Sequence, residues 1–213
     1  MLMLVAAVNA QSAMIAGEVM DQAGQPVADA VVVANPTQGM PPNSSGSAVS
    51  EVLDQRNREF IPHVLVVRTG TEVSFPNNDK VRHHVYSFSQ AKRFEIKLYK
   101  GMPPNPIRFD KPGIAILGCN IHDWMISYVY VSDSPYFTKT DVSGHWSLAV
   151  PVDSYKISIW HPYLEQGEAI ISEPLTPAEH QITYLNRGIV VKNKFRSGKP
   201  PASLQDEGYK GEP

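Results

Sequence analysis

The chain has 213 residues, of which 19 are Lys or Arg and 21 are Asp or Glu, so its formal net charge is −2. This balance, with no basic block before the C-terminal segment, gives no electrostatic footprint for nucleic-acid binding. The 18 prolines favour strands joined by loops over long helices, and the single cysteine excludes an internal disulfide.

The first segment, MLMLVAAVNAQSA over residues 1–13, is apolar and ends in small residues. This pattern indicates a secretory signal peptide cleaved near Ala10 or Ala13, although the usual basic start is missing. The alternative is a first buried strand. The run is too short to span a bilayer, and no later segment is apolar enough to do so. We therefore expect an exported, periplasmic protein without a transmembrane span.

The next segment reads as two strands joined by a turn. Alternation over residues 15–20 predicts the first strand, the Gly- and Pro-containing residues 21–26 predict a turn, and residues 27–34 predict the second strand. Residues 35–50 have the composition of a loop.

Residues 51–132 contain closely spaced runs of β-branched and aromatic residues separated by turn signals. In residues 94–99, Phe94, Ile96 and Leu98 share one face, which is the period of a half-buried strand. Many short strands of this kind indicate a sandwich or a barrel. The predicted strands are 63–67, 71–75, 85–88, 94–99, 114–117 and 126–131.

The remainder of the chain repeats the style of the first segment. Residues 141–144 predict a turn, and alternation predicts strands over 146–150 and 155–159, with a last strand at 182–185. Residues 191–213 are rich in Lys, Gly and Pro and have little to bury, so we expect this tail to be disordered.

Residues 14–38 and 134–190 together resemble a carboxypeptidase regulatory-like (transthyretin-like) domain. The resemblance consists of Gly17-x-Val19, Gly24-x-Pro26-Val27-x-x-Ala30, Asp141-x-x-Gly144 and Tyr155-x-Ile157. It implies a small β-sandwich in which residues 47–132 are inserted or against which they are packed. The alternative is one continuous sandwich with a long loop.

The residues with the clearest chemistry surround the lone cysteine. Cys119-x2-His122-x2-Met125 lies directly between two predicted strands, so a thiolate, an imidazole and a thioether can converge on one metal ion. A second imidazole can come from His83 or His84, about 36 residues upstream. Two histidines, a cysteine and a weak axial methionine form the arrangement of blue-copper sites, and thiolate and thioether suit Cu(I).

Residues 59–130 resemble a cupredoxin of the plastocyanin and amicyanin type. The motif Phe60-x-Pro62-x-x-Leu65-x-Val67-x-x-Gly70-x-x-Val73-x-Phe75-x-Asn77 is similar to the opening strands of that family. The resemblance implies a Greek-key β-sandwich with one mononuclear type 1 copper, held by His83, Cys119, His122 and Met125. The whole chain is also similar to exported proteins labelled methylamine utilisation proteins.

One position departs from the cupredoxin pattern, because the family often has asparagine after the first histidine and this chain has His84. Neighbouring residues of a strand point to opposite faces, so only one of His83 and His84 can face the metal. The resemblance favours His83. The backbone amide of His84 is still able to hydrogen-bond the sulfur of Cys119.

Three functions follow from these patterns. The first is electron transfer with a redox partner such as a c-type cytochrome or a periplasmic dehydrogenase, a partner class that family analogy implies. The second is a copper chaperone or resistance protein that binds and releases Cu(I). The third is a binding module with structural copper.

No catalytic motif accompanies the metal-site pattern. The sequence has no nucleophile elbow, phosphate loop or paired-carboxylate signature, so we do not expect an enzyme. His63 is not expected to be a ligand. His145 and His161 belong to the transthyretin-like segments, and Trp160-His161-Pro162 is either a packing cluster or a segment that faces the metal domain. The prediction for the whole chain is an all-β protein.

Overall fold

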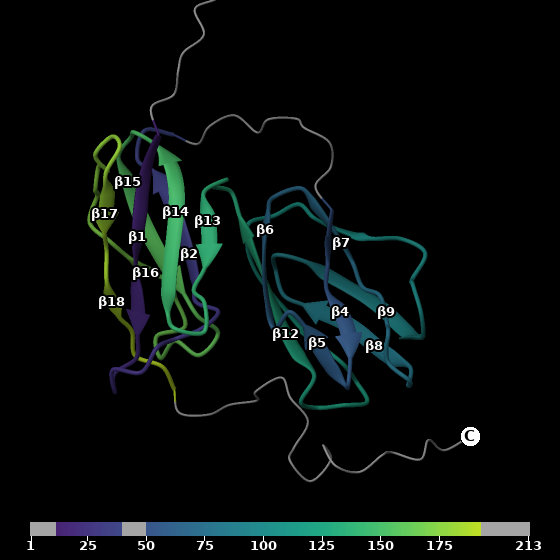
Figure 1. The fold of residues 1–213 in the computed structure, drawn as a ribbon. Helices are drawn as coiled ribbons and strands as arrows, with labels where there is room; N and C mark the ends of the chain where they lie inside the picture. Colours follow the sequence, from purple (N-terminus) through teal and green to yellow (C-terminus); the bar gives the residue numbers. More distant parts are fainter. Residues whose placement is uncertain (1–11, 40–49, 193–213) are drawn as a thin grey trace, which may run out of the picture. The chain divides into compact units, whose positions relative to one another are not determined.

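The computed structural model describes residues 12–39 and 50–192 (Figure 1). In these residues strands are the only regular elements, which confirms the all-β prediction. None of the described segments forms a helix that is long and apolar enough to cross a membrane. The predicted leader up to residue 11 and the predicted tail from residue 193 lie outside the described residues, whereas Ser12 and Ala13 are part of the first strand.

The chain divides into two compact units. Among the described residues, unit 1 contains residues 12–39, 136–161 and 168–190, and unit 2 contains residues 50–135, 162–167 and 191–192. Most of unit 2 therefore occurs between the two halves of unit 1 in the sequence.

Unit 1 contains two four-stranded sheets. In the first sheet the central strand β1 (Ser12–Met20) pairs with β14 (His145–Pro151), β17 (Ile182–Tyr184) and β18 (Arg187–Gly188). The second sheet has the order β13 (Phe137–Lys139), β2 (Val31–Pro36), β15 (Tyr155–Trp160) and β16 (Ile170–Ile171). Every second residue of β1 and of β14 is buried, as expected for strands with one face on a core.

The second strand of unit 1 begins later in the chain than the sequence pattern predicts. Its prediction began at residue 27, but β2 begins at Val31. Asp29 adopts a left-handed backbone conformation with φ of 60°, which interrupts an extended chain. The backbone on both sides is held instead by Thr140, whose Oγ1 accepts from the Ala30 amide and donates to the Val27 carbonyl.

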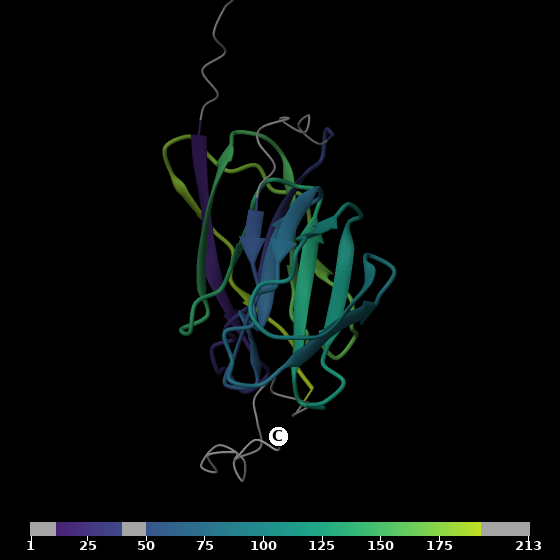
Figure 2. The same cartoon turned by 90° about the vertical axis from the view of Figure 1, so that its right-hand side faces the viewer.

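Unit 2 contains a five-stranded sheet, a three-stranded sheet and a hairpin (Figure 1 and Figure 2). The larger sheet has the order β6 (Val64–Arg68), β12 (Ile126–Ser132), β11 (Gly113–Gly118), β8 (His83–Phe88) and β9 (Arg93–Tyr99). The smaller sheet has the order β10 (Ile107–Phe109), β7 (Thr71–Ser74) and β3 (Ser50–Val52), and β4 (Asp54–Arg56) pairs with β5 (Glu59–Ile61).

Both sheets of unit 2 contribute to one apolar core. Val73 and Phe109 from the smaller sheet are fully buried in the same cluster as Val85, Leu117 and Val129 from the larger sheet. The sheets therefore form a sandwich with its apolar faces inward. Cys119 and Met125 belong to this cluster as well, so two of the four predicted metal ligands are part of the packed core.

The predicted alternation in β9 is wrong at its end, because the pairing of β8 with β9 contains a bulge. His83 pairs with Tyr99 and Val85 pairs with Ile96, so three steps along β9 match two steps along β8. A bulge of this kind turns the following side chains to the other face. Leu98 is consequently 53% exposed, whereas the Tyr99 hydroxyl donates inward to the Phe75 carbonyl.

Candidate metal centre

The candidate metal centre lies where β11 ends and β8 begins. Gly118 is the last residue of β11, and the chain then turns through residues 119–125 before β12 starts. The amide of Met125 donates to the carbonyl of His122 at 2.9 Å, which closes this short loop. Because the loop follows directly from a paired strand, Cys119 is held next to β8, whose first residue is His83.

The loop and the strand bring three potential ligand atoms together. The Cys119 sulfur lies 3.9 Å from Nδ1 of His83 and 4.0 Å from Nδ1 of His122. The three ligand atoms all lie within 4.8 Å of one another. Metal–nitrogen bonds of about 2.0–2.1 Å and metal–thiolate bonds of about 2.3 Å, the values for zinc, fit between atoms at these separations. The three residues are therefore able to hold one metal ion.

Burial differs among the three residues. His83 is fully buried and Cys119 is 4% exposed, whereas His122 is half-buried. The rings of His83 and His122 lie 5.0 Å apart. Of the three residues, His122 is therefore the one most exposed to solvent.

The environment of Cys119 favours the thiolate. Burial by itself raises the pKa of this thiol, but hydrogen bonds to His122 and His83 and from the backbone amides of His84 and Ile121 outweigh that effect and lower the pKa to about 5. Since the thiolate is the form that binds metals, the sulfur is prepared for coordination near neutral pH.

The second nitrogen of His83 is also engaged. Its Nε2 lies 2.9 Å from Oδ2 of Asp79. Burial by itself lowers the pKa of His83, but its hydrogen bonds with Cys119 and Asp79 outweigh burial and raise the pKa overall. Burial by itself raises the pKa of Asp79, but its hydrogen bonds with His83 and with two backbone amides outweigh burial and lower the pKa overall. This carboxylate was not singled out in the sequence, because its link to His83 depends on the folding of the loop between β7 and β8.

His84 points away from the cluster, as strand alternation predicts. Its Nε2 lies 3.0 Å from Oε1 of Glu95 on the neighbouring strand β9. Its backbone amide nevertheless hydrogen-bonds the Cys119 sulfur, which confirms that expectation. The structure thus brings His83, and not His84, to the cysteine.

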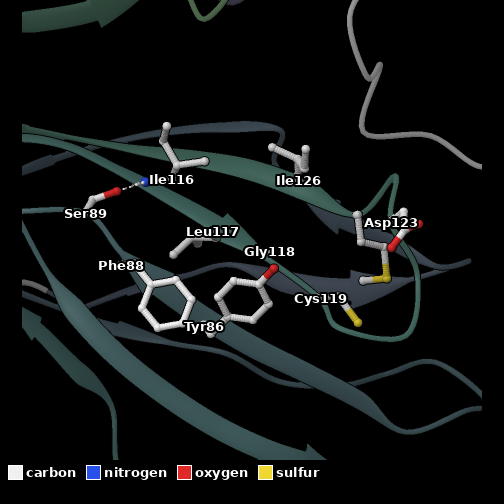
Figure 3. A pocket seen from close by; sticks show the side chains of 10 residues that line it. Tyr86, Phe88, Ser89, Ile116, Leu117, Gly118, Cys119, Asp123 and Ile126 are labelled. Carbon is white, nitrogen blue, oxygen red and sulfur yellow. Dashed lines mark hydrogen bonds between the residues drawn. The ribbon is translucent and has the colours of Figure 1, made fainter.

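Met125 is completely buried in the same core cluster as Cys119. Both residues line a hollow of about 380 Å³ that residues of β8 and β11 also line. Figure 3 shows Cys119 and its neighbours in this hollow. Tyr86 and Phe88 form one wall of this hollow, and the Tyr86 ring lies beside Gly118. The role of Met125 as a ligand stays a prediction.

The other histidines do not join the cluster. His63 bonds the Ile126 carbonyl through Nδ1 and the Tyr163 hydroxyl through Nε2, both at 3.1 Å. His145, in unit 1, lies 3.0 Å from Oε1 of Glu18. Among the described residues, His83, Cys119 and His122 form the one group of this kind that can hold a metal.

The described part of the chain is thus an all-β protein, in which unit 2 is a sandwich with a buried cysteine between two histidines. No protein-family model and no curated protein matches the sequence. Among solved structures, a purple cupredoxin from Nitrosopumilus maritimus is 22% identical, with a TM-score of 0.34, and the match covers 39% of this chain and 99% of that chain. An amicyanin from Paracoccus versutus is 17% identical, with a TM-score of 0.33, and the match covers 48% of this chain and 97% of that chain.

Proposed function

We propose that unit 2 is a cupredoxin that binds one copper ion at His83, Cys119, His122 and Met125 and carries single electrons. The observation that supports this proposal best is the buried Cys119 sulfur between two Nδ1 atoms at 3.9 and 4.0 Å. Two imidazoles, a thiolate and a weak thioether form the type 1 copper set, in which the axial ligand tunes the potential. Copper bound there exchanges one electron between its cuprous and cupric states.

The roles of the residues follow from their surroundings. Cys119 supplies a thiolate whose charge is stabilised by two backbone amides. His83 is held from both ring nitrogens inside the protein, which keeps its position fixed during electron exchange. His122 is the half-buried ligand, so we assign electron entry and exit to its exposed edge.

The surroundings of the site favour electron transfer over transport of Cu(I). Delivery of copper needs a site that opens, whereas His83 and Cys119 are buried. His83 is hydrogen-bonded to Asp79, and Cys119 to two backbone amides. The copper chaperone is therefore only the second candidate function. We assign no catalysis to this site.

The setting of the protein is part of the proposal. The apolar segment at residues 1–13 supports export to the periplasm, and a c-type cytochrome or a periplasmic dehydrogenase is the proposed class of partner. We propose that unit 1 is the transthyretin-like domain that the motifs in residues 14–38 and 134–190 indicate, and that the chain is related to the proteins labelled methylamine utilisation proteins.

The test is the visible spectrum of the full chain after addition of Cu(II). We expect an intense thiolate-to-copper charge-transfer band in the unmodified protein and in a His145→Ala control, whose substitution lies in unit 1. Cys119→Ser should lose the band. Absence of the band from the folded, unmodified protein would contradict type 1 copper and favour Cu(I) handling or a metal-free binding module.

A further inference from the structure

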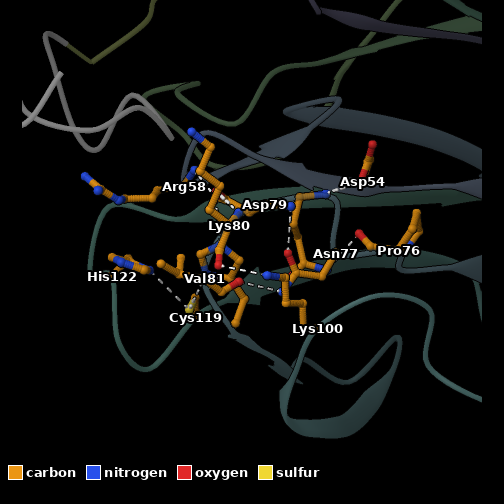
Figure 4. Close-up of polar contacts among 12 residues, drawn as sticks. Asp54, Arg58, Pro76, Asn77, Asp79, Lys80, Val81, Lys100, Cys119 and His122 are labelled. Atoms are coloured by element: carbon orange, nitrogen blue, oxygen red, sulfur yellow. Dashed lines mark hydrogen bonds and ion pairs between the residues drawn. The ribbon is translucent and has the colours of Figure 1, made fainter. Parts of the chain in front are cut away.

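The Asp79 carboxylate contacts the ring nitrogen of His83 that faces away from Cys119. The Asp79 side chain, labelled in Figure 4, is 11% exposed. Its Oδ2 lies 2.9 Å from Nε2 of the fully buried His83. The other ring nitrogen, Nδ1, faces the Cys119 sulfur. A ring whose Nε2–H is donated to a carboxylate presents the lone pair of Nδ1, so this contact selects the tautomer that can bind a metal.

The carboxylate is itself fixed by the backbone. Its Oδ2 accepts from the Arg58 amide at 2.6 Å, and its Oδ1 accepts from the Lys80 amide at 2.7 Å. The Asp79 amide donates to Oδ1 of Asn77, whose side-chain nitrogen in turn donates to the carbonyls of Val81 and Tyr99. The loop before His83 is therefore built around the position of this carboxylate.

The same backbone turn also reaches the second histidine. Asn57 and Arg58 form the turn between β4 and β5, and both have left-handed φ values, 53° and 60°. The Arg58 carbonyl accepts from Nε1 of Trp124 at 3.0 Å, and the Trp124 ring lies 5.2 Å from the ring of His122. The turn thus connects to His83 through Asp79 and to His122 through Trp124.

We infer that Asp79 is a positioning residue of the metal centre, which fixes His83 and, through its negative charge, favours Cu(II) over Cu(I). The inference rests on the proposed function. A ligating imidazole that donates its other N–H to a carboxylate becomes a stronger base, and such partners typically change metal affinity or activity about 10–100-fold when they are removed. A stronger donor and a nearby negative charge both stabilise the more positive metal.

Two substitutions separate the hydrogen bond from the charge. Asp79→Asn keeps an oxygen that accepts from His83 but removes the charge, so we expect it to retain the charge-transfer band. Its ratio of Cu(I) to Cu(II) affinity should rise about tenfold, which corresponds to about 59 mV in reduction potential for one electron. Asp79→Ala removes both interactions and should also weaken binding of Co(II) about 10–100-fold.

Asp110→Asn is the matched control, because this exposed carboxylate of unit 2 contacts Lys92 and lies outside the cluster. It should leave both potential and Co(II) affinity unchanged. Circular dichroism establishes that each variant is folded, and a misfolded Asp79→Ala leaves the decision to Asp79→Asn. Equal potentials for Asp79→Asn, Asp110→Asn and the unmodified protein would overturn the inference.

The Co(II) measurement separates this inference from the proposed function. If the unmodified protein gives no copper band, but Asp79→Ala binds Co(II) more weakly than the unmodified protein does, the copper function fails and the positioning role of Asp79 stands. If the band forms and the Asp79 variants change neither potential nor Co(II) affinity, the copper function stands and the inference fails.

Discussion

Cys119 shows how one residue acquires its chemistry from its neighbours. A buried thiol normally resists ionisation, but here two imidazoles and two backbone amides surround the sulfur. The Ile121 amide is available because the chain leaves a paired strand at Gly118 and turns around the sulfur, whereas the His84 amide comes from the neighbouring strand β8. The lowered pKa of this cysteine therefore depends on the loop and on strand β8 together.

The metal-free protein should accordingly titrate as an acidic thiol. We expect the ultraviolet absorbance of the thiolate to disappear only as the pH falls through about 5, compared with an ordinary value of 9.0. Since the folded-state pKa is lowered, the thiolate contributes to folding stability fully above the ordinary value and loses that contribution as the pH falls towards 5. Cys119→Ser should lack the absorbance change, and a midpoint near 9 would refute the assigned environment.

Part of the site was predictable at the level of single residues. Cys119, His122 and Met125 are separated by two residues each, so their proximity follows from one short loop. Strand alternation predicted that only one of His83 and His84 faces the cysteine, and the resemblance to cupredoxins, not the alternation, favoured His83. Asp79 and Arg58 were not predicted, because they are 21 residues apart and a folded turn brings the Arg58 amide to the carboxylate.

At the scale of elements, most long strands were predicted well, and several short strands were missed. The six strands predicted within residues 51–132 are all present with small shifts at their ends, because each combines β-branched or aromatic residues with turn signals. β4, with the sequence Asp-Gln-Arg, has no such pattern. It exists because it pairs with β5, and pairing partners are not encoded in local periodicity.

The close packing of β8 against β11 gives a test of the element that supports Cys119. A Cβ atom added at Gly118 would lie 2.8 Å from Oη and 2.9 Å from Cζ of Tyr86. Gly118→Ala therefore displaces the Tyr86 ring, and we expect a loss of about 1–3 kcal/mol in the free energy of unfolding, the usual range for overpacking. Denaturant unfolding of the metal-free protein measures this loss.

A double-mutant cycle identifies the cause of that loss. In a Tyr86→Ala background the added methyl group meets no ring, so Gly118→Ala should cost clearly less than in the unmodified protein. An equal loss in both backgrounds would mean that the tyrosine ring is not what excludes a side chain at Gly118.

At the scale of the molecule, the described residues form two compact units. In unit 1, fully buried Ile15 and Val32 belong to different sheets, and in unit 2 one cluster contains residues of both sheets. The sequence indicated a discontinuous first part through turn and strand motifs at its two ends. It did not indicate that residues 162–167 belong with unit 2, because these six residues have no periodic pattern.

Because the two units are each compact, we expect each to unfold in its own transition. Gly17 in β1 is a suitable probe, because a Cβ atom there would lie 2.0 Å from the backbone oxygen of Leu185. The backbone next to β17 would have to move, so Gly17→Ala should destabilise unit 1 by about 1–3 kcal/mol or more. Trp146 and Trp160 lie in unit 1 and Trp124 lies in unit 2, so the test uses a Trp124→Phe background. In that background tryptophan fluorescence follows unit 1, and loss of the copper band follows unit 2.

The expected result is a lower midpoint for the fluorescence transition of Gly17→Ala and an unchanged midpoint for loss of the copper band. Gly188→Ala is the matched control, since no atom lies within 4 Å of a Cβ at that position. It should leave both midpoints unchanged. If both transitions of Gly17→Ala shifted together by the same amount, the units would unfold as one cooperative structure. Stability of unit 1 would then be a requirement for the metal centre in unit 2.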